Sequence, residues 1–457
     1  MTRSIQTDFF KETQSSLNNL GDICLWWQLT SVSRESVERL YQGDVEDILR
    51  PHQIRNVDEK SYALEVLTPS DQDGMIGQAR MDLDVTSPIE EQLDLVLEMA
   101  QNNLNKAWRP VEAPTEPYPE VATADPKILD CPETVLLNLE DKALKAIQDL
   151  ANVKVTTAEL YVRKAHVERL SSTGVTTQKD LSDIYFEIAM EQTPDHKNQE
   201  VNSVVTSVSS TDLDLKVFIE KIAEETLSLG QTQEPKTTES AVILVDAEAI
   251  SSFLLAIKAQ LNCADEYYQF PHLKEEDVFE YEGDALSLSL DPYMDAMVDS
   301  SPYTGDGFVA QEADLIVKGT VKTQIIGNRF GQYLDKTPNA IMGNMIVPAG
   351  TVTLEELRGK FKEYIEVIKF SSLLVDDHKL TWSSEIKLAK HHHADGRVTL
   401  LKGGVVSGNV RENLKHCYFS KELSRVNFPG TGFYEGKGYW GPASMLILSG
   451  VSIVGTE

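Results

Sequence analysis

Cysteine is scarce in this chain of 457 residues, which has only Cys24, Cys131, Cys263 and Cys417. No two of them have the CxxC spacing of a zinc or redox motif. Isolated cysteines of this kind are typical of buried thiols in a reducing compartment. We therefore expect free thiols rather than a disulfide framework.

Long apolar segments are also missing. No window approaches the roughly eighteen uninterrupted apolar residues of a membrane helix. The first residues, MTRSIQTDFFKETQSS, lack the apolar core of a signal peptide. These absences predict a soluble, cytoplasmic protein that does not associate with membranes.

Positive charge is in short supply, because 42 Lys and Arg residues face 72 Asp and Glu residues. The formal net charge of −30 repels nucleic-acid phosphates and anionic lipids. Basic residues gather only in short segments such as Arg358–Lys362. Direct binding to nucleic acid is therefore not expected.

Common enzyme signatures are absent as well. No GxSxG, Walker A or GxGxxG motif lies between a predicted strand and a predicted helix. The chain is nevertheless 41% hydrophobic, which is enough for a sizeable core. Its length allows two or three domains.

A tetrapeptide, VERL, occurs at Val37–Leu40 and again at Val167–Leu170. Chance explains a match of four letters, so the flanking segments must decide. In both copies a helical pattern comes first, and alternating strand-like segments and an amphipathic helix follow. The predicted helices are Phe9–Leu20, Ser87–Leu104, Pro132–Ala151 and Thr211–Leu229, with Ser87 and Thr211 as N-caps. We predict a duplicated strand–helix unit, Asp22–Leu104 and Thr156–Leu229, within one layered domain.

Two breaks divide the chain. The Pro-rich, acidic segment 109–126 predicts an extended connector, and the polar segment Gly230–Ser240 predicts a domain boundary. Beyond it, short apolar segments separated by Gly-containing turns predict strands, with helices near Ala247–Leu261 and Thr353–Glu366. The predicted fold is α+β, with an N-terminal α/β domain at residues 1–235 and a mostly β C-terminal domain at 236–457.

Five segments of the second half follow one another in a recognisable order. They are Leu286–Met294, Ser300–Leu334, Thr337–Asn344, Ser407–Leu414 and Tyr439–Gly455. Each motif is weak alone, but their order resembles the TldD/PmbA family, which is labelled "modulator of DNA gyrase" and regarded as metallopeptidases. The resemblance implies an N-terminal domain of strands and helices joined to a mostly β domain, in agreement with the division above.

The zinc motif of the TldD branch has no counterpart here. That branch carries HExxxH on a helix of the second domain, and a later Cys completes the zinc site. The matching helix, Ser251–Cys263, holds neither His nor Glu, and Gly430–Pro442 holds no Cys. The chain therefore resembles the PmbA/TldE branch, which implies no catalytic residue, no metal ligand and no stoichiometric zinc in this chain. Zinc is expected only in a TldD-like partner.

Two other groups of residues have chemistry of their own. Three consecutive histidines, His391, His392 and His393, suggest a cation site, but neighbours on a strand point to opposite faces and cannot all reach one ion. A solvated hairpin is favoured. His416 and Cys417 are adjacent, as in a thiol–imidazole pair, but the same alternation favours a buried thiol.

The resemblance implies a non-catalytic subunit of a metallopeptidase. With a TldD-like zinc-bearing subunit, or as a homodimer, it would form a chamber for unfolded peptides in proteolysis or peptide maturation. Strand edges can bind an extended peptide by β-augmentation, and Gly-rich turns let a peptide approach closely. The predicted peptide-binding residues are Gly305, Asp306, Gly307, Asn339, Gly343, Asn344, Gly438 and Gly441. Hairpin geometry alone also explains these glycines.

Two alternatives remain open. One is a homodimeric peptide-binding or scaffold protein without a peptidase partner. The other is a divergent hydrolase that uses His391–His393 or Cys417.

Overall fold

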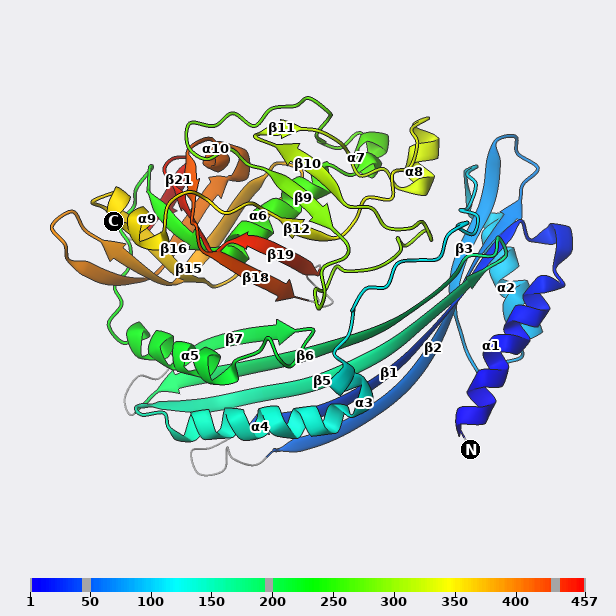
Figure 1. The fold of residues 1–457 in the computed structure, drawn as a ribbon, viewed down its shortest axis with the longest axis horizontal. Helices are drawn as coiled ribbons and strands as arrows, with labels where there is room; N and C mark the ends of the chain where they lie inside the picture. Colours follow the sequence, from blue (N-terminus) through cyan, green and yellow to red (C-terminus); the bar gives the residue numbers. More distant parts are fainter. Residues whose placement is uncertain (1, 43–50, 194–199, 429–435, 456–457) are drawn as a thin grey trace.

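The computed structural model describes residues 2–42, 51–193, 200–428 and 436–455. The first half is built on one antiparallel, seven-stranded sheet, ordered β4-β3-β2-β1-β5-β6-β7. In Figure 1 its long strands curve beneath the second half of the chain. The strands are β1 (Trp26–Gln42), β2 (Gln53–Pro69), β3 (Met75–Leu83), β4 (Leu104–Lys106), β5 (Val153–Ser171), β6 (Thr176–Gln192) and β7 (Glu200–Ser207).

The sheet contains two copies of one arrangement. From the central pair, β1 and β5, one meander runs outward through β2 and β3 and the other through β6 and β7. A helix precedes and another follows each meander: α1 (Thr2–Asn18) and α2 (Ile89–Asn102), then α4 (Pro132–Gln148) and α5 (Leu215–Leu229). The predicted recurrence of helix, strands and helix is therefore present, with both copies in one sheet.

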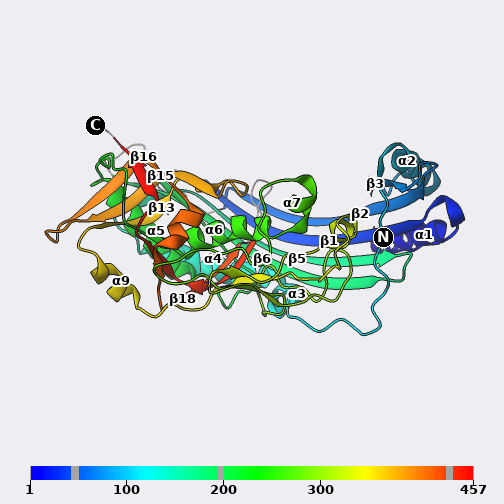
Figure 2. The ribbon, with the colours of Figure 1, turned by 90° about the horizontal axis from the view of Figure 1, so that it is seen from above.

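Two apolar clusters hold the helices to the sheet. Buried residues of α1 and α2 pack on β1, β2 and β3, around Leu29 and Val96. Those of α4 and α5 pack on β5 and β6, around Val162 and Ile219. Seen from above in Figure 2, α1 and α2 lie at one end of the molecule.

The second half contains two sheets. One has six strands, ordered β11-β10-β9-β12-β19-β18, and the other has eight, with β17-β20-β8-β13-β15-β16-β21 in line and β14 paired to β15. The strands are β8 (Ile243–Asp246), β9 (Leu288–Asp291), β10 (Ala313–Val317), β11 (Thr320–Val321), β12 (Asn344–Ile346), β13 (Tyr364–Phe370), β14 (Leu374–Val375), β15 (Thr381–His392), β16 (Val398–Asn409), β17 (Cys417–Phe419), β18 (Leu423–Phe428), β19 (Lys437–Pro442), β20 (Ser444–Ile447) and β21 (Val451–Val454). The predicted α+β class is confirmed.

One helix, α6 (Ala247–Gln260), forms the core that the two sheets share. Its buried Phe253 and Ile257 belong to a single cluster with Leu288 of one sheet and Ile386 of the other. The short elements are η1 (Gly21–Ile23), α3 (Pro126–Asp130), α7 (Cys263–Tyr268), α8 (Asn328–Tyr333), α9 (Leu354–Lys360) and α10 (Val410–Lys415).

Both predicted N-caps of the first half are wrong. Helix α2 has Pro88 at its N-cap, and the Ser87 hydroxyl instead donates to Asp84 Oδ2 at 2.9 Å. Helix α5 begins at Leu215. Its N-cap is Asp214, whose carboxylate accepts from the backbone N–H groups of Lys216 and Val217, so Thr211 lies outside the helix. A carboxylate is a good cap because it also carries the charge that a helix N-terminus attracts.

The predicted helix Thr353–Glu366 is too long. Thr353 caps α9 through a capping box with Glu356, as its sequence suggests, but the helix ends at Lys360. The residues after it form β13, which pairs with β8 and β15. Sheet pairing therefore overrides the helical pattern of this segment.

The predicted connector is extended, with no helix or strand between β4 and α3. It contacts both halves of the chain. The Tyr118 hydroxyl donates to the Gly307 carbonyl at 2.6 Å, and the Thr123 hydroxyl donates to the Asp180 carbonyl of β6 at 2.6 Å. The predicted boundary at residue 235 falls in a segment where Thr238 already pairs with β21.

Among the described residues, no helix combines the length and the apolar character needed to span a bilayer.

Replacing Gly77 with Ala tests how α2 packs on the sheet. A Cβ at Gly77 would stand 2.3 Å from the Ala100 carbonyl oxygen, so the helix would have to move. We expect Gly77→Ala to lower the free energy of unfolding by about 1–3 kcal/mol. At Gly359 of α9 a Cβ meets nothing within 4 Å. Gly359→Ala should instead stabilise by about 0.5–1 kcal/mol, because Ala favours a helix. Denaturant titration measures both, and equal effects would contradict the packing argument.

Candidate functional site

A cleft of about 750 Å³ lies between the first-half sheet and the second half of the chain. One wall is formed by β5 and β6, and the other by α6 and the loops around residues 298–305 and 341–343. Figure 1 shows the second half lying over this part of the sheet. The cleft is therefore bounded by both domains.

The sheet wall follows from the alternation of side chains along β5. Leu160 and Val162 point to the helix-covered face, so Val167 and Arg169 point to the opposite face, where the cleft lies. Lys179 of β6 pairs with Val167 and also lines the cleft. Arg169 Nη1 donates to the Gly305 carbonyl at 2.7 Å, which joins the two walls.

The helix wall is the half-buried side of α6. Asp246 caps the helix by accepting from the Ala249 N–H at 3.1 Å. With the core-facing side buried, α6 turns Leu255, Lys258 and Ala259 to the cleft. None of these three side chains is a metal ligand. Lys258 Nζ lies 3.3 Å from the Gly343 carbonyl oxygen.

A buried amide organises the loops of the second wall. Asn344 is fully buried, and its Nδ2 donates to the Asp291 carbonyl at 3.0 Å and to Ser300 Oγ at 2.9 Å. Its Oδ1 accepts from the Asp299 N–H at 3.1 Å. The Gly438 N–H donates to Asp299 Oδ2 at 3.0 Å. This network fixes the acidic side chain of Asp299 at the cleft wall.

The charges of the cleft are balanced. Burial, followed by the neighbouring Arg169, lowers the pKa of Lys179. Burial raises the pKa of Asp265. Three basic and three acidic side chains line the cleft: Arg169, Lys179, Lys258, Asp265, Asp299 and Asp377. A phosphate site would instead have an excess of positive charge.

Two of the eight predicted peptide-binding residues, Gly305 and Gly343, line the cleft. Gly305 is exposed, and a Cβ built on it meets nothing within 4 Å. Gly343 has φ 128°, and a Cβ there would stand 2.3 Å from the Asp291 carbonyl carbon. Gly343 is thus required by backbone geometry, whereas Gly305 leaves open space at the cleft.

Four of the other predicted residues hold the surrounding loops together. Asp306 Oδ2 accepts from the first N–H of α8 at 3.2 Å, and Gly307 accepts from the connector. Asn339 bonds to backbone groups of the β11–α8 loop. A Cβ at Gly441 would stand 2.5 Å from the Tyr439 hydroxyl. Asn344 and Gly438 belong to the network described above. That these residues contact a peptide stays a prediction.

Sequence reasoning did not select the charged side chains of the cleft. Arg169 lies in the second VERL copy, which attracted notice as a possible repeat rather than as a site. Lys258 stands alone among apolar neighbours, whereas Lys179 lies in a polar segment between Gln178 and Asp180. A lone charged residue on the otherwise apolar face of a predicted helix is the signal that would have pointed to Lys258.

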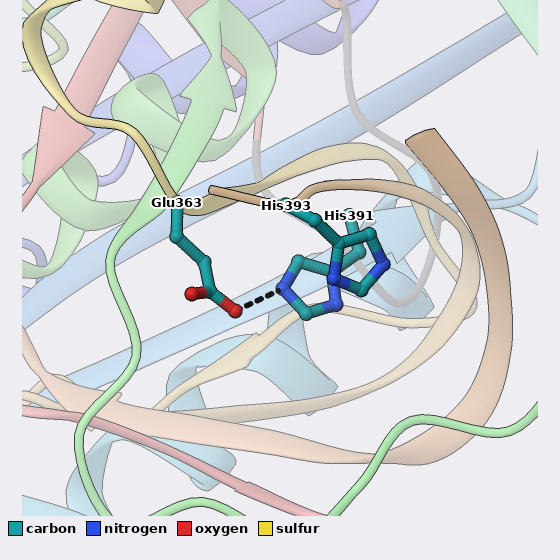
Figure 3. A group of neighbouring side chains, drawn as sticks. All are labelled: Glu363, His391 and His393. Atoms are coloured by element: carbon teal, nitrogen blue, oxygen red, sulfur yellow. Dashed lines mark hydrogen bonds and ion pairs between the residues drawn. The ribbon is translucent and has the colours of Figure 1, made fainter. Parts of the chain in front are cut away.

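The histidine run forms the end of a hairpin, as predicted, but its side chains are partly buried. His391 and His393 lie on one side with Glu363, and the ligand atoms of the three residues all lie within 4.8 Å of one another (Figure 3). Burial, followed by the neighbouring His393, lowers the pKa of His391. None of the three lines the cleft.

His416 and Cys417 do not form a catalytic pair. Cys417 is fully buried, and burial raises the pKa of its thiol to about 12. His416 Nδ1 turns away to Glu282 Oε2 at 3.3 Å. All four cysteines are free, as expected. A nucleophile must ionise and reach solvent, so this thiol does not suit that role.

Residues 239–453 match the family described as the PmbA/TldA metallopeptidase C-terminal domain. The second half is a PmbA/TldD domain. The family predicted from the motif order is confirmed. No curated protein matches the chain significantly.

Crystal structures extend the likeness of fold to the whole chain. A candidate modulator of DNA gyrase from Bacteroides thetaiotaomicron superposes with a TM-score of 0.74 at 16% identity, covering 99% of each chain. A second one, from Thermotoga maritima, gives 0.73 at 14% identity and covers 100% of both chains. TldE from Thermococcus kodakarensis gives 0.73 at 14% identity, covering 98% of this chain and 100% of its own.

Removing the buried amide of Asn344 should disturb the PmbA/TldD domain. Asn344→Ala leaves Ser300, Asp299 and a backbone carbonyl without their partner, so we expect a loss of about 1–3 kcal/mol in unfolding free energy. Asn102→Ala is the matched control, because Asn102 is exposed at the end of α2. Its effect should stay within about 0.5 kcal/mol. Thermal unfolding checks both, and a neutral Asn344→Ala would refute the role of the network.

Proposed function

We propose that this chain is the non-catalytic, PmbA/TldE-type subunit of a PmbA/TldD peptidase and that its cleft binds an extended segment of unfolded peptide. The observation that supports this proposal is the position of α6. This helix, the counterpart by resemblance of the HExxxH helix of the TldD branch, faces a cleft with Leu255, Lys258 and Ala259 instead of zinc ligands.

Peptide hydrolysis by this family's chemistry needs a metal ion with three protein ligands and a water molecule. Within the described residues, the one group of three possible ligands that lie close together is Glu363, His391 and His393, none of which lines the cleft. We therefore assign no catalytic residue and no catalytic cofactor to this chain. The zinc would come from a TldD-like subunit.

The polar groups of the cleft suit a peptide backbone. Arg169 and Lys258 both donate to main-chain carbonyls, those of Gly305 and Gly343. Every peptide presents the same carbonyl group, whatever its sequence. A bound strand whose carbonyls replace these two would be recognised through its main chain, the part of a peptide that β-augmentation also uses.

Assembly with a second subunit belongs to the same proposal. We place the contact on the second domain, either with a TldD-like subunit or with a second copy of this chain. In the apolar segment Ser444–Gly455, β20 is poorly placed for it because this strand is buried between β17 and β8, whereas β21 is the last strand at the edge of its sheet. The net charge of −30 is compatible with assembly, since the cores of interfaces are depleted in charge. Four free thiols are in keeping with a cytoplasmic location.

Filling the open space at Gly305 tests peptide binding. Gly305→Trp places a large side chain at the cleft, so we expect the affinity for a fluorescently labelled unfolded peptide to fall at least about tenfold, or 1.4 kcal/mol. Gly359→Trp is the matched control, because Gly359 also has open space around it but lies on α9. Fluorescence anisotropy measures both. Equal affinities for the two variants would exclude the cleft as the binding site.

Mixing the chain with a zinc-bearing relative tests its role in cleavage. Light scattering should show a dimer or larger assembly at micromolar concentration. The chain alone should not cleave an unfolded peptide, whereas the mixture should cleave it in a chelator-sensitive manner. A monomer in both samples would refute the assembly. Chelator-sensitive cleavage by the chain alone would refute the non-catalytic assignment, and a dimer inactive in every mixture would favour the homodimeric scaffold.

A further inference from the structure

The end of the β15–β16 hairpin brings three possible metal ligands together. Glu363 stands just before β13, which pairs with β15 so that Ile365 lies opposite His391. The His391 and His393 rings are 3.9 Å apart between centroids, and His391 Nε2 lies 3.0 Å from Glu363 Oε1. Figure 3 shows the carboxylate and both rings on one side of the hairpin.

The pleat of β15 divides the three histidines into a pair and a single residue. Side chains two positions apart share a face, so His391 and His393 lie together. His392 points the other way, where its ring stacks on Tyr364 at 4.4 Å and 7°, and its Nε2 lies 3.2 Å from Glu366 Oε2. Three consecutive histidines therefore offer two possible ligands, and the carboxylate of Glu363, just before β13, offers a third.

We propose that Glu363, His391 and His393 form a binding site for a divalent transition-metal cation of the zinc type. Two imidazole nitrogens and one carboxylate oxygen are ligands that zinc, nickel and copper accept. Their ligand atoms lie within 4.8 Å of one another, against about 3.3 Å between ligands around a tetrahedral zinc. The side chain of Glu363 is 57% exposed, so it can turn to close this gap at little cost.

A hydrogen bond already orients one of the ligands. His393 Nε2 lies 2.9 Å from Thr399 Oγ1 on β16, which leaves Nδ1 for the cation. A partner on the second ring nitrogen is the usual companion of a metal-bound histidine. The negative field of the chain attracts cations to such a site.

The role that follows is structural. A bound cation would join the start of β13 to the tip of the β15–β16 hairpin and leave its remaining positions to water. The expectation of no stoichiometric zinc rests on α6, which has no ligands. The hairpin site departs from that expectation, because its ligands come from other elements of the chain. It is therefore independent of peptide cleavage in the cleft.

Zinc titration of the tag-free chain tests the site, and His392 supplies the control. Calorimetry should show one Zn²⁺ per chain, with affinity falling at least tenfold in His391→Ala and in His393→Ala but unchanged in His392→Ala. Co²⁺ added instead should give a visible absorption band that is lost in His391→Ala and in His393→Ala. Zinc should also raise the melting temperature of the wild type and of His392→Ala, and chelation should reverse the shift.

Three results would overturn the proposal. The first is no uptake of Zn²⁺ above that of a metal-free control protein. The second is a loss of zinc affinity in His392→Ala equal to that in His391→Ala and His393→Ala, which would indicate non-specific binding by the histidine run. The third is a loss of zinc affinity in His416→Ala. The His416 ring of the wild type also pairs with a single carboxylate but has no second histidine beside it. His416→Ala also serves as the control if His392→Ala fails to fold.

Discussion

The pairing of β1 with β5 is the interaction on which the rest of the molecule depends. The two strands are hydrogen-bonded in register from Gln28 opposite Ser171 to Gln42 opposite Thr157. Each strand begins in the apolar cluster of its own unit and ends beside the cluster of the other unit. In β1, Leu29 belongs to the cluster under α1 and α2, and Val37 belongs to the cluster under α4 and α5. Burial of both clusters thus fixes one register, because a slip by one residue would turn every side chain to the wrong face.

That register also creates the sheet wall of the cleft. The alternation that buries Leu160 and Val162 under the helices leaves Arg169 on the opposite face, where it reaches the second domain. On the other side, the packing of α6 between two sheets decides which of its residues face the cleft. Core packing and site geometry are therefore two results of the same patterns, period two on β5 and period 3.6 on α6.

Local patterns in the sequence were enough to predict the long helices of the first half, helix α6, the duplicated order and the mostly β second half. They were insufficient where several nearby residues can occupy the same position. Ser87 and Thr211 were predicted N-caps, but Pro88 and Asp214 occupy the N-cap positions. They were also insufficient where tertiary pairing decides, as in β13. The cleft could not be predicted, because its walls come from segments that only the folded chain brings together.

The connector has a mechanical consequence. Thr123 hydrogen-bonds to β6, and Tyr118 hydrogen-bonds to the loop at Gly307. The connector therefore links the two walls of the cleft. The ring of Tyr118 also rests edge-on against Tyr303 of the cleft wall. The walls can separate only by breaking these contacts. If the cleft binds peptide as proposed, a guest that enters while these contacts hold would have to be as thin as a single strand, so an unfolded chain would fit and a folded one would not.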